Sequence, residues 1–287
     1  MTGVEPGSAL YVCDLDGTLL RSDATLSGFA RDGINRLLDA GVHLTLASAR
    51  GTAGMRALLD GVRLRLPVIE LNGAFVSDMR SGRHVASNVL SAPDACAAVE
   101  VILSTGVDPV LSTWDGRRDR VHFGVRANDS ISWYVEEKRR HRDPRLAPCD
   151  DLLAVANGEE VAQITTFTRD LEAAALTDRL RHAIGPAARV HAAGNVYWPG
   201  WTEITVSHRA AEKGAAVPAL LDACAIPDAA VIACGDHLND LGLFAAAAHS
   251  IAPANAHPTV LESAAEIVAS NDEDGVVRHL LERHGES

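Results

Sequence analysis

The stretch YVCDLDGTLLRSD (residues 11–23) joins a short apolar run to two carboxylates, Asp14 and Asp16, which a glycine and a threonine follow. The apolar residues 9–13 predict a buried strand, so the carboxylates stand at its carboxyl end, where open parallel sheets bind ligands. Two carboxylates at close range repel each other, and one of them has a raised pKa unless a cation compensates. A hard divalent cation such as Mg²⁺ takes oxygen ligands. We therefore expect a cation site here, with a plain surface turn as the alternative, because Asp and Gly also favour turns.

The chain around this stretch alternates apolar runs with helical patterns, which is typical of an α/β protein with a parallel sheet. Apolar runs predict strands at residues 42–47, 67–71, 229–234, 249–255 and 266–270. Helical spacing predicts helices at residues 26–41, 52–61, 212–226, 240–248, 258–265 and 275–285. In the first helix Ser27 is the expected N-cap, and the shared apolar face consists of Phe29, Ile34, Leu37 and Leu38. In the helix at 212–226, Pro218 is expected to cause a bend.

The middle of the chain has a different pattern, with antiparallel character. Hairpins are expected at residues 108–125, turned at Asp115-Gly116, and at 189–206. A strand at 160–168 and helices at 93–106 and 171–185 complete this region. We therefore expect one α/β core made of residues 1–82 and 208–287, interrupted by a smaller α+β domain at residues 83–207.

The composition narrows the class of protein. The chain has 287 residues, is 47% apolar and 22% charged, and carries a formal net charge of −12, which argues against a nucleic-acid-binding surface. Its five cysteines show no CxxC spacing, which favours a reduced, cytoplasmic setting. Residues 1–10 do not resemble a signal peptide, and no apolar run is long enough to predict a membrane span. The twelve histidines show no zinc-binding spacing.

A second acidic cluster occurs in ACGDHLNDLGLF (residues 233–244). Asp236, Asn239 and Asp240 follow the predicted strand at 229–234, as the first pair follows its own strand. Acidic tips on neighbouring strands can build one cation site, and Thr18 offers a hydroxyl that can orient a carboxylate. The alternative for this cluster is that an Asp only caps a helix.

Together these segments resemble the haloacid-dehalogenase-like superfamily of phosphohydrolases. Four motifs match in order, and they are DLDGTLL (14–20), LASAR (46–50), EKG (212–214) and GDHLND (235–240). The segment ELNGA (70–74) and the position of the insert resemble the Cof-type subgroup, whose insert is a large α/β cap. Two departures concern substrate detail, since Ala49 stands where a Gly is usual and Leu243 where Met is common.

The resemblance implies a Rossmann-like parallel-sheet core and phosphoryl transfer through an aspartyl-phosphate. It makes Asp14 the nucleophile and Asp16 the acid and base, with Ser48 and Lys213 binding the transferring phosphoryl group. The substrate-contacting residues that it implies are Ser48, Ala49, Arg50, Asn72, Lys213 and Asn239. The Mg²⁺ ligands that it implies are Asp14, Asp16 through its backbone carbonyl, Asp236 and Asp240, with Asp240 also able to hold Lys213. Without the four motifs, the interpretation of Lys213 would be a solvated surface charge and that of Ser48 a turn residue.

The expected function is therefore a Mg²⁺-dependent phosphatase of small phosphorylated metabolites, above all sugar phosphates. The alternatives are a dedicated glycosyl-phosphate phosphatase of the sucrose, trehalose or mannosylglycerate type, a phosphomutase, and a non-catalytic sensor of phosphorylated ligands. Dehalogenation is not expected, because that branch lacks the acid/base that Asp16 supplies here. The expected partner is a small-molecule phosphate ester, with no nucleic acid and no membrane, and the expected state is a monomer or weak homo-oligomer.

Two clusters in the insert admit two interpretations each. Trp198 and Trp201, in YWPGW (197–201), either pack across a hairpin or stack on the substrate. Three arginines either belong to a solvated turn or bind a second anionic group, and they are Arg117, Arg118 and Arg120.

Overall fold

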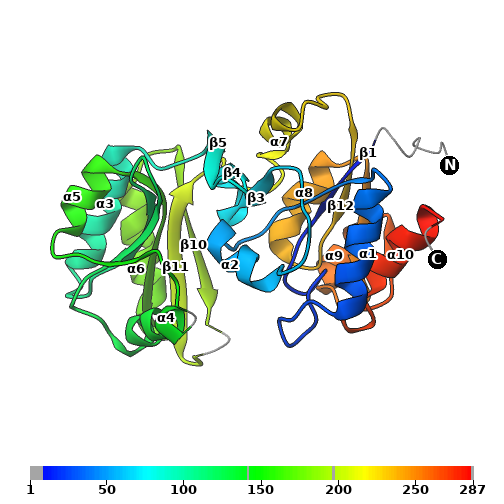
Figure 1. The fold of residues 1–287 in the computed structure, drawn as a ribbon. Coiled ribbons are helices and arrows are strands. Elements are labelled where there is room, and N and C mark those ends of the chain that lie inside the picture. The colour runs from blue at the N-terminus through cyan, green and yellow to red at the C-terminus, as the bar shows by residue number, and fades with distance from the viewer. Residues whose placement is uncertain (1–8, 141, 196–197, 286–287) are drawn as a thin grey trace. The chain divides into compact units, whose positions relative to one another are not determined.

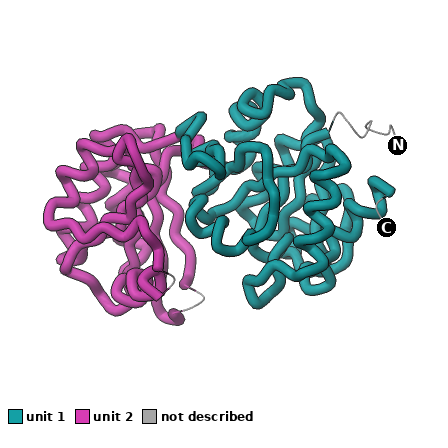
Figure 2. The backbone as a smooth tube through the Cα atoms, in the orientation of Figure 1, with its two compact units in different colours: residues 1–87, 212–287 teal, residues 88–211 magenta. Residues whose placement is uncertain are grey.

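A computed structural model of the chain describes residues 9–140, 142–195 and 198–285, and it divides into two compact units (Figures 1 and 2). Unit 1 consists of residues 1–87 and 212–287, and unit 2 of residues 88–211. The stretch in which a signal peptide was not expected lies outside the described residues, except for its last two positions. No helix in the described part of the chain is long and apolar enough to cross a membrane.

Unit 1 is built on a five-stranded parallel sheet in the order β14-β13-β12-β1-β2. Its strands are β1 (Ala9–Cys13), β2 (His43–Leu46), β12 (Ala230–Cys234), β13 (His249–Pro253) and β14 (Glu266–Val268). Strand β1 lies between β12 and β2, and it pairs Cys13 with Cys234 on one side and with Leu46 on the other. The carboxyl ends of three strands therefore lie level with one another. The expected α/β class with a parallel sheet is confirmed.

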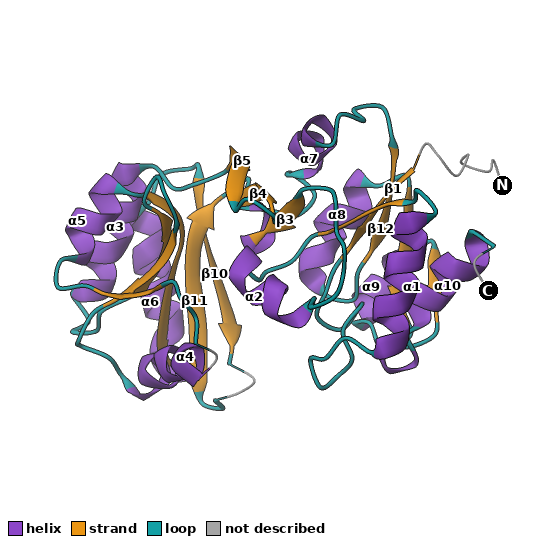
Figure 3. Ribbon diagram, viewed as in Figure 1, coloured by secondary structure: helices purple, strands orange, loops and turns teal. Residues whose placement is uncertain are grey.

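Helices cover both faces of this sheet, so β1 is apolar on both sides (Figure 3). Tyr11 and Cys13 belong to one apolar cluster, and Leu10 and Val12 to the other. The first cluster is closed by α1 (Gly28–Asp39), α2 (Thr52–Leu58) and α10 (Gly275–Arg283). The second is closed by α7 (Val217–Ala223), α8 (Leu241–Ala246) and α9 (Pro258–Ser263). Each fully buried Leu contributes about 1.5–3 kcal/mol of transfer free energy, which holds the sheet rigidly between its helices.

Helix α1 confirms its expected cap but not its whole expected face. The Ser27 hydroxyl accepts a hydrogen bond from the Ala30 amide at 2.9 Å, as an N-cap does. Phe29 was expected on the buried face, and this is wrong, because it is 39% exposed and Ala30 is buried in its place. Phe29 instead lies beneath the guanidinium of Arg278, at 4.2 Å from its ring centroid.

The helix expected at 212–226 is shorter than predicted and is not bent. Helix α7 begins at Val217, so Pro218 lies in its first turn, where the missing amide proton has no partner to lose. Residues 212–216 form a bend and turns instead, because a helix that continued through Pro218 would need the amide proton that proline lacks and would clash with the proline ring.

A small antiparallel sheet follows β2 in unit 1. It consists of β3 (Val68–Glu70), β4 (Phe75–Asp78) and β5 (Arg83–Ser87), with a 3₁₀ turn at Leu71–Gly73 between the first two. An isolated parallel bridge from Ala47 to Ile69 joins β3 to the end of β2. Only β3 was predicted from the sequence.

Unit 2 is a six-stranded sheet in the order β10-β11-β9-β6-β7-β8, antiparallel except for its last pair. Its strands are β6 (Val110–Trp114), β7 (Asp119–Phe123), β8 (Leu146–Pro148), β9 (Glu160–Arg169), β10 (Ala188–Gly194) and β11 (Trp201–His208). One face carries α3 (Ala92–Leu103), α5 (Leu152–Gly158) and α6 (Asp170–Ala183), and the other carries α4 (Asp129–Arg140). The turn predicted at Asp115-Gly116 is confirmed, with Gly116 at φ +84°.

Candidate active site

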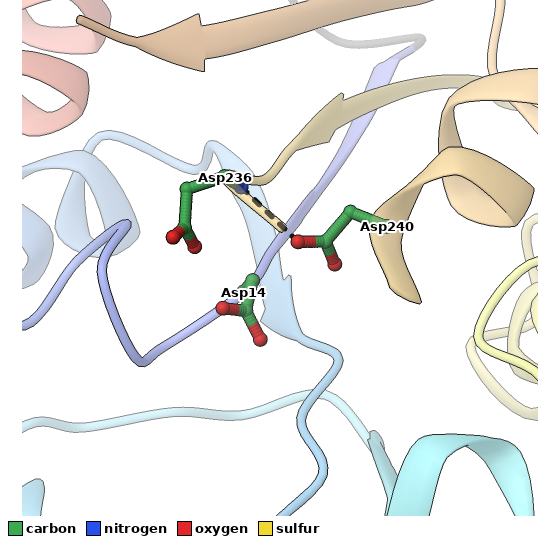
Figure 4. A group of neighbouring side chains, drawn as sticks. All are labelled: Asp14, Asp236 and Asp240. Atoms are coloured by element: carbon green, nitrogen blue, oxygen red, sulfur yellow. Dashed lines mark hydrogen bonds between the residues drawn. The ribbon is translucent and has the colours of Figure 1, made fainter. Parts of the chain in front are cut away.

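The carboxyl ends of β1 and β12 bring three carboxylates together. Asp14 follows β1 directly, and its amide donates to the Cys234 carbonyl at 2.8 Å. Asp236 follows β12, and Asp240 lies one short turn further on. One carboxylate oxygen from each of the three lies within 4.8 Å of the others, and Figure 4 shows them converging. The parallel register therefore creates the acidic cluster that the sequence predicts.

Lys213 lies in the turn before α7 and points into this cluster. Its Nζ donates to Asp14 Oδ1 and to Asp240 Oδ1, each at 2.6 Å, and the residue is only 1% exposed. Gly214 allows this approach, because a Cβ there would lie 2.1 Å from the Gly242 carbonyl oxygen. Burial lowers the pKa of Lys213, but the charges of Asp14 and Asp240 outweigh it and raise the pKa above its usual value. The ammonium is therefore a fixed positive charge beside Asp14.

Asp240 uses both of its carboxylate oxygens inside the protein. While Oδ1 accepts from Lys213, Oδ2 accepts from the amides of Asp236 and His237, each at 3.1 Å. Figure 4 shows the bond from the Asp236 amide. The 3₁₀ turn Leu238–Asp240 directs it there, and the residue is fully buried. Asp240 therefore holds Lys213 and the Asp236 backbone in place. Its oxygens are less available as cation ligands than those of Asp14 and Asp236.

The cluster carries more negative than positive charge. Three carboxylates face one ammonium, and burial raises the pKa of Asp14 to about 8, with Lys213 opposing the shift and Asp240 adding to it. Burial likewise raises the pKa of Asp236, against the hydrogen bond from Thr18. The donors are all carboxylate oxygens, which suits a hard divalent cation that would restore both groups to their ionised form.

Gly17 and Thr18 place Asp236. The Thr18 hydroxyl donates to Asp236 Oδ1 at 2.9 Å, so it orients a carboxylate as the sequence suggests. Gly17 has φ +80°, and a Cβ at this position would lie 2.3 Å from Asp236 Oδ2. The Gly17 carbonyl also accepts from the Asn255 side chain at 2.8 Å, a contact that sequence reasoning missed.

Asp16 is separated from the buried cluster, and Arg50 holds it. The guanidinium donates from Nε to Oδ2 and from Nη2 to Oδ1 of Asp16, both at 2.7 Å. The Arg50 amide donates to Ser48 Oγ at 3.1 Å, and Ser48 is fully buried. Because this bond uses an acceptor lone pair of Ser48, its hydroxyl proton remains able to reach a phosphoryl oxygen.

The other residues expected to contact substrate lie on the loops around this cluster. Asn239 Nδ2 donates to Asn72 Oδ1 at 3.0 Å, and Asn72 has left-handed backbone at φ 55°. Ala49 is exposed on the loop between Ser48 and Arg50.

Sequence reasoning also missed Glu70, a fully buried carboxylate at the end of β3. It accepts from the Thr52 amide at 2.5 Å and from the Ser77 hydroxyl, and it thereby ties the start of α2 to β4. Its signal was a charge at the end of an apolar strand.

The tryptophans and the arginines for which the sequence allowed two interpretations lie in different surroundings in unit 2. Trp201 is 5% exposed and belongs to an apolar core, where the Arg169 guanidinium lies 4.2 Å from its ring centroid. Trp198 is partly exposed, while Tyr197 of the same segment lies outside the described residues. Arg118 and Arg120 pair with Asp115, which agrees with a hairpin turn.

Comparisons with known proteins agree over almost the whole chain. A model of the haloacid dehalogenase-like hydrolase family matches residues 11–280. The 5-amino-6-(5-phospho-D-ribitylamino)uracil phosphatase YwtE of Bacillus subtilis is 28% identical over 279 residues, covering 92% of this chain and 93% of the relative. A haloacid dehalogenase-like hydrolase structure from Bacteroides thetaiotaomicron has a TM-score of 0.74 at 24% identity, covering 96% of this chain and 98% of that one. A subclass IIB sugar phosphatase has a TM-score of 0.69 at 17% identity, covering 98% and 100%, so the fold is shared.

Proposed function

The chain belongs to the haloacid dehalogenase-like hydrolases, and from this we propose that it hydrolyses small phosphate monoesters through an aspartyl-phosphate formed on Asp14. Family membership and relatives named as phosphatases confirm the expected enzyme class, a phosphoric monoester hydrolase. The resemblance inferred from the four motifs is confirmed in the same way.

The observation that carries the proposed mechanism is the contact between Lys213 and Asp14. A buried ammonium 2.6 Å from the carboxylate keeps the two acidic neighbours from excluding an anionic substrate. Asp14 attacks phosphorus, the bond from phosphorus to the ester oxygen breaks, and Lys213 stabilises the charge on the transferring group. Ser48 donates its free hydroxyl proton to a phosphoryl oxygen.

Asp16 serves both halves of the reaction. Its carboxyl group protonates the departing ester oxygen, and the resulting carboxylate then takes a proton from the water that hydrolyses the aspartyl-phosphate. Its half-exposed side chain suits this exchange better than the buried carboxylate of Asp240 does.

A divalent cation fits beside Asp14 and Asp236. Hydrolases of this superfamily generally use a metal ion, and the described residues include a matching set of oxygen donors. We assign Mg²⁺, held by Asp14, Asp236 and the Asp16 backbone carbonyl, with Asp240 supporting the set. Its contribution when bound is to neutralise charge between Asp14 and the phosphate.

We propose that residues 83–207, which comprise most of unit 2, form a cap that selects the leaving group, and that residues 1–82 and 208–287 form the catalytic core. Sugar phosphates are the leading substrate class, which the fold shared with a sugar phosphatase supports. Asn72, Asn239, Arg50 and Ala49 are proposed to lie around the bound ester, as the resemblance implies.

A hollow in unit 2 favours a second candidate substrate, a phosphate ester with a heterocyclic leaving group. It has a volume of about 900 Å³, and Trp133, Trp198 and Phe123 contribute to its wall. The two tryptophan rings lie 6.0 Å apart between centroids, and aromatic faces of this kind stack on planar rings. The relative YwtE is named for a phosphate ester that carries a uracil ring, which is compatible with this candidate.

A phosphate-release screen tests these proposals. Sugar phosphates, a ribityl-linked heterocyclic phosphate and p-nitrophenyl phosphate are compared with Mg²⁺ and with EDTA, using wild type, Asp14→Asn and Trp198→Ala. We expect Mg²⁺-dependent release that Asp14→Asn abolishes. A loss with Trp198→Ala that is confined to the heterocyclic ester supports the second candidate, and an equal effect on all esters rejects it. Activity retained in Asp14→Asn rejects the nucleophile, isomerisation without phosphate release indicates a phosphomutase, and no turnover at all indicates a sensor.

A further inference from the structure

We propose that Arg50 is a positioning residue for Asp16, and that it thereby sets how strongly turnover depends on the leaving group. The inference rests on the proposed function and deepens it. It adds a role that acts through another side chain to the proposed position of Arg50 beside the ester.

Arg50 contacts the Asp16 carboxylate at two points, which fixes the geometry of the pair. Arg50 Nε and Nη2 each lie 2.7 Å from a different oxygen of Asp16, so the planar guanidinium fixes both the position and the plane of the carboxylate. Lysine has a single ammonium on a flexible stem and cannot reproduce two parallel donors. Among the described residues, the Asp16 carboxylate accepts side-chain hydrogen bonds from Arg50 alone.

The pair is poorly suited to a stabilising role. The side chains of Arg50 and Asp16 are 38% and 44% exposed, and exposed ion pairs contribute only about 0.2–1 kcal/mol to stability. A carboxylate that must give and take a proton needs access to solvent or substrate, but it also needs a fixed direction. A half-exposed, two-point contact provides both.

The backbone of Arg50 is anchored at the same time. Its amide donates to Ser48 Oγ at 3.1 Å, and its carbonyl accepts from the Leu71 amide at 3.2 Å. The residue also comes directly before Gly51, the N-cap of α2. Arg50 therefore links Asp16 to the loop that carries Ser48. This link aligns Asp16, which protonates the ester oxygen, with Ser48, which binds a phosphoryl oxygen.

This alignment matters only when the leaving oxygen needs a proton. In the first step Asp14 bonds to phosphorus, the ester P–O bond breaks, and the Asp16 proton moves to the departing oxygen. Nitrophenolate leaves readily as an anion, whereas phenolate is more basic and gains more from protonation. Positioned general acids accelerate such steps by about 10²–10⁴-fold, so a misaligned Asp16 penalises basic leaving groups selectively.

The test compares p-nitrophenyl, p-chlorophenyl and phenyl phosphate with wild type, Arg50→Lys, Asp16→Asn and the double variant. Arg56→Lys is the matched control, because Arg56 lies on α2 and its guanidinium donates to the Met79 carbonyl rather than to Asp16. We expect Arg50→Lys to lower kcat by less than about 3-fold for p-nitrophenyl phosphate and by at least about 10-fold for phenyl phosphate, which is a tenth of the lower limit of general acid catalysis. KM should change little, and Arg50→Lys should add little in the Asp16→Asn background.

Three outcomes overturn the inference: an equal loss for all three esters, a loss confined to KM, or full additivity of the two substitutions. Arg50→Gln, whose amide retains one donor group, provides a second variant if Arg50→Lys unfolds, and circular dichroism checks both. If the wild type releases phosphate from none of the esters, the proposed function itself fails. If the wild type is active and Arg50→Lys shows the same dependence on the leaving group, only the role of Arg50 fails.

Discussion

Lys213 and Asp240 form an ion pair from which water is excluded, with Nζ and Oδ1 2.6 Å apart and both side chains 0% exposed. A buried pair of this kind is held in place by the cost of separating it, because either charge alone would lack solvation. The same ammonium contacts Asp14, so the pair also fixes the charge beside the proposed nucleophile.

Asp240→Ala should destabilise the protein by about 3–5 kcal/mol, because it leaves the Lys213 charge and two backbone amides without their partner. Asp240→Asn, which keeps a hydrogen-bonding oxygen, should cost less. Urea denaturation in EDTA measures both. A loss under 1 kcal/mol for the alanine variant would show that Asp240 does not hold Lys213.

Gly17→Ala should abolish cation binding, because its Cβ would displace the Asp236 carboxylate. Gly116→Ala is the matched control, since Gly116 has φ +84° and open space around its Cβ position. Both substitutions should cost about 1–2 kcal/mol in backbone strain. Only the first should remove Mg²⁺ binding in titration calorimetry, and equal Mg²⁺ affinities would contradict this account of Gly17.

Asp16→Ala should lose turnover while keeping most of its Mg²⁺ affinity, because only the backbone of Asp16 is proposed to bind the ion. Asp236→Ala should lose both. Calorimetry and phosphate release, measured on the same preparations, separate the two effects. Complete loss of Mg²⁺ binding in Asp16→Ala would assign its carboxylate to the cation.

The metal-free protein should lose stability as the pH rises from about 4 to about 8. Burial raises the pKa of Asp14 from 3.8 to about 8, so within this window the unfolded state has released a proton that the folded state still binds. Asp14→Asn removes this dependence, and its advantage in Tm over wild type should grow across the window. Saturating Mg²⁺ should flatten the wild-type profile, and a wild-type Tm that rises with pH in EDTA would refute the assignment.

The parallel sheet was predictable because its strands are apolar on both faces and lie at regular spacing. Helix α4 was not, because only Ser130, Ile131 and Val135 are fully buried in it and its second half consists mostly of charged residues. The start of α7 was misplaced because the helical pattern outweighed Pro218, although proline belongs in a first turn.

The acidic cluster was predictable from two strand ends, since parallel strands finish at one edge of a sheet. The partner of Asp16 was not, because the direction of the Arg50 side chain depends on how two loops fold against each other. The sequence also did not show that Asp236 and Asp240, both in GDHLND, have different environments. The burial of Asp240, its two amide contacts and its ion pair with Lys213 separate it from Asp236.

Strand β1 pairs with β12, and Ala9 lies opposite Ala230, although the whole of unit 2 separates the two strands in the sequence. During synthesis β1 and Asp14 therefore leave the ribosome first, and β12 and Asp236 leave it long afterwards. Unit 2 comes from one uninterrupted segment and can fold in the meantime, as domains generally do. One edge of β1 stays open until residue 230 arrives, so the acidic cluster is completed late in synthesis. Nascent chains halted before β12 should contain a folded unit 2 and bind no Mg²⁺.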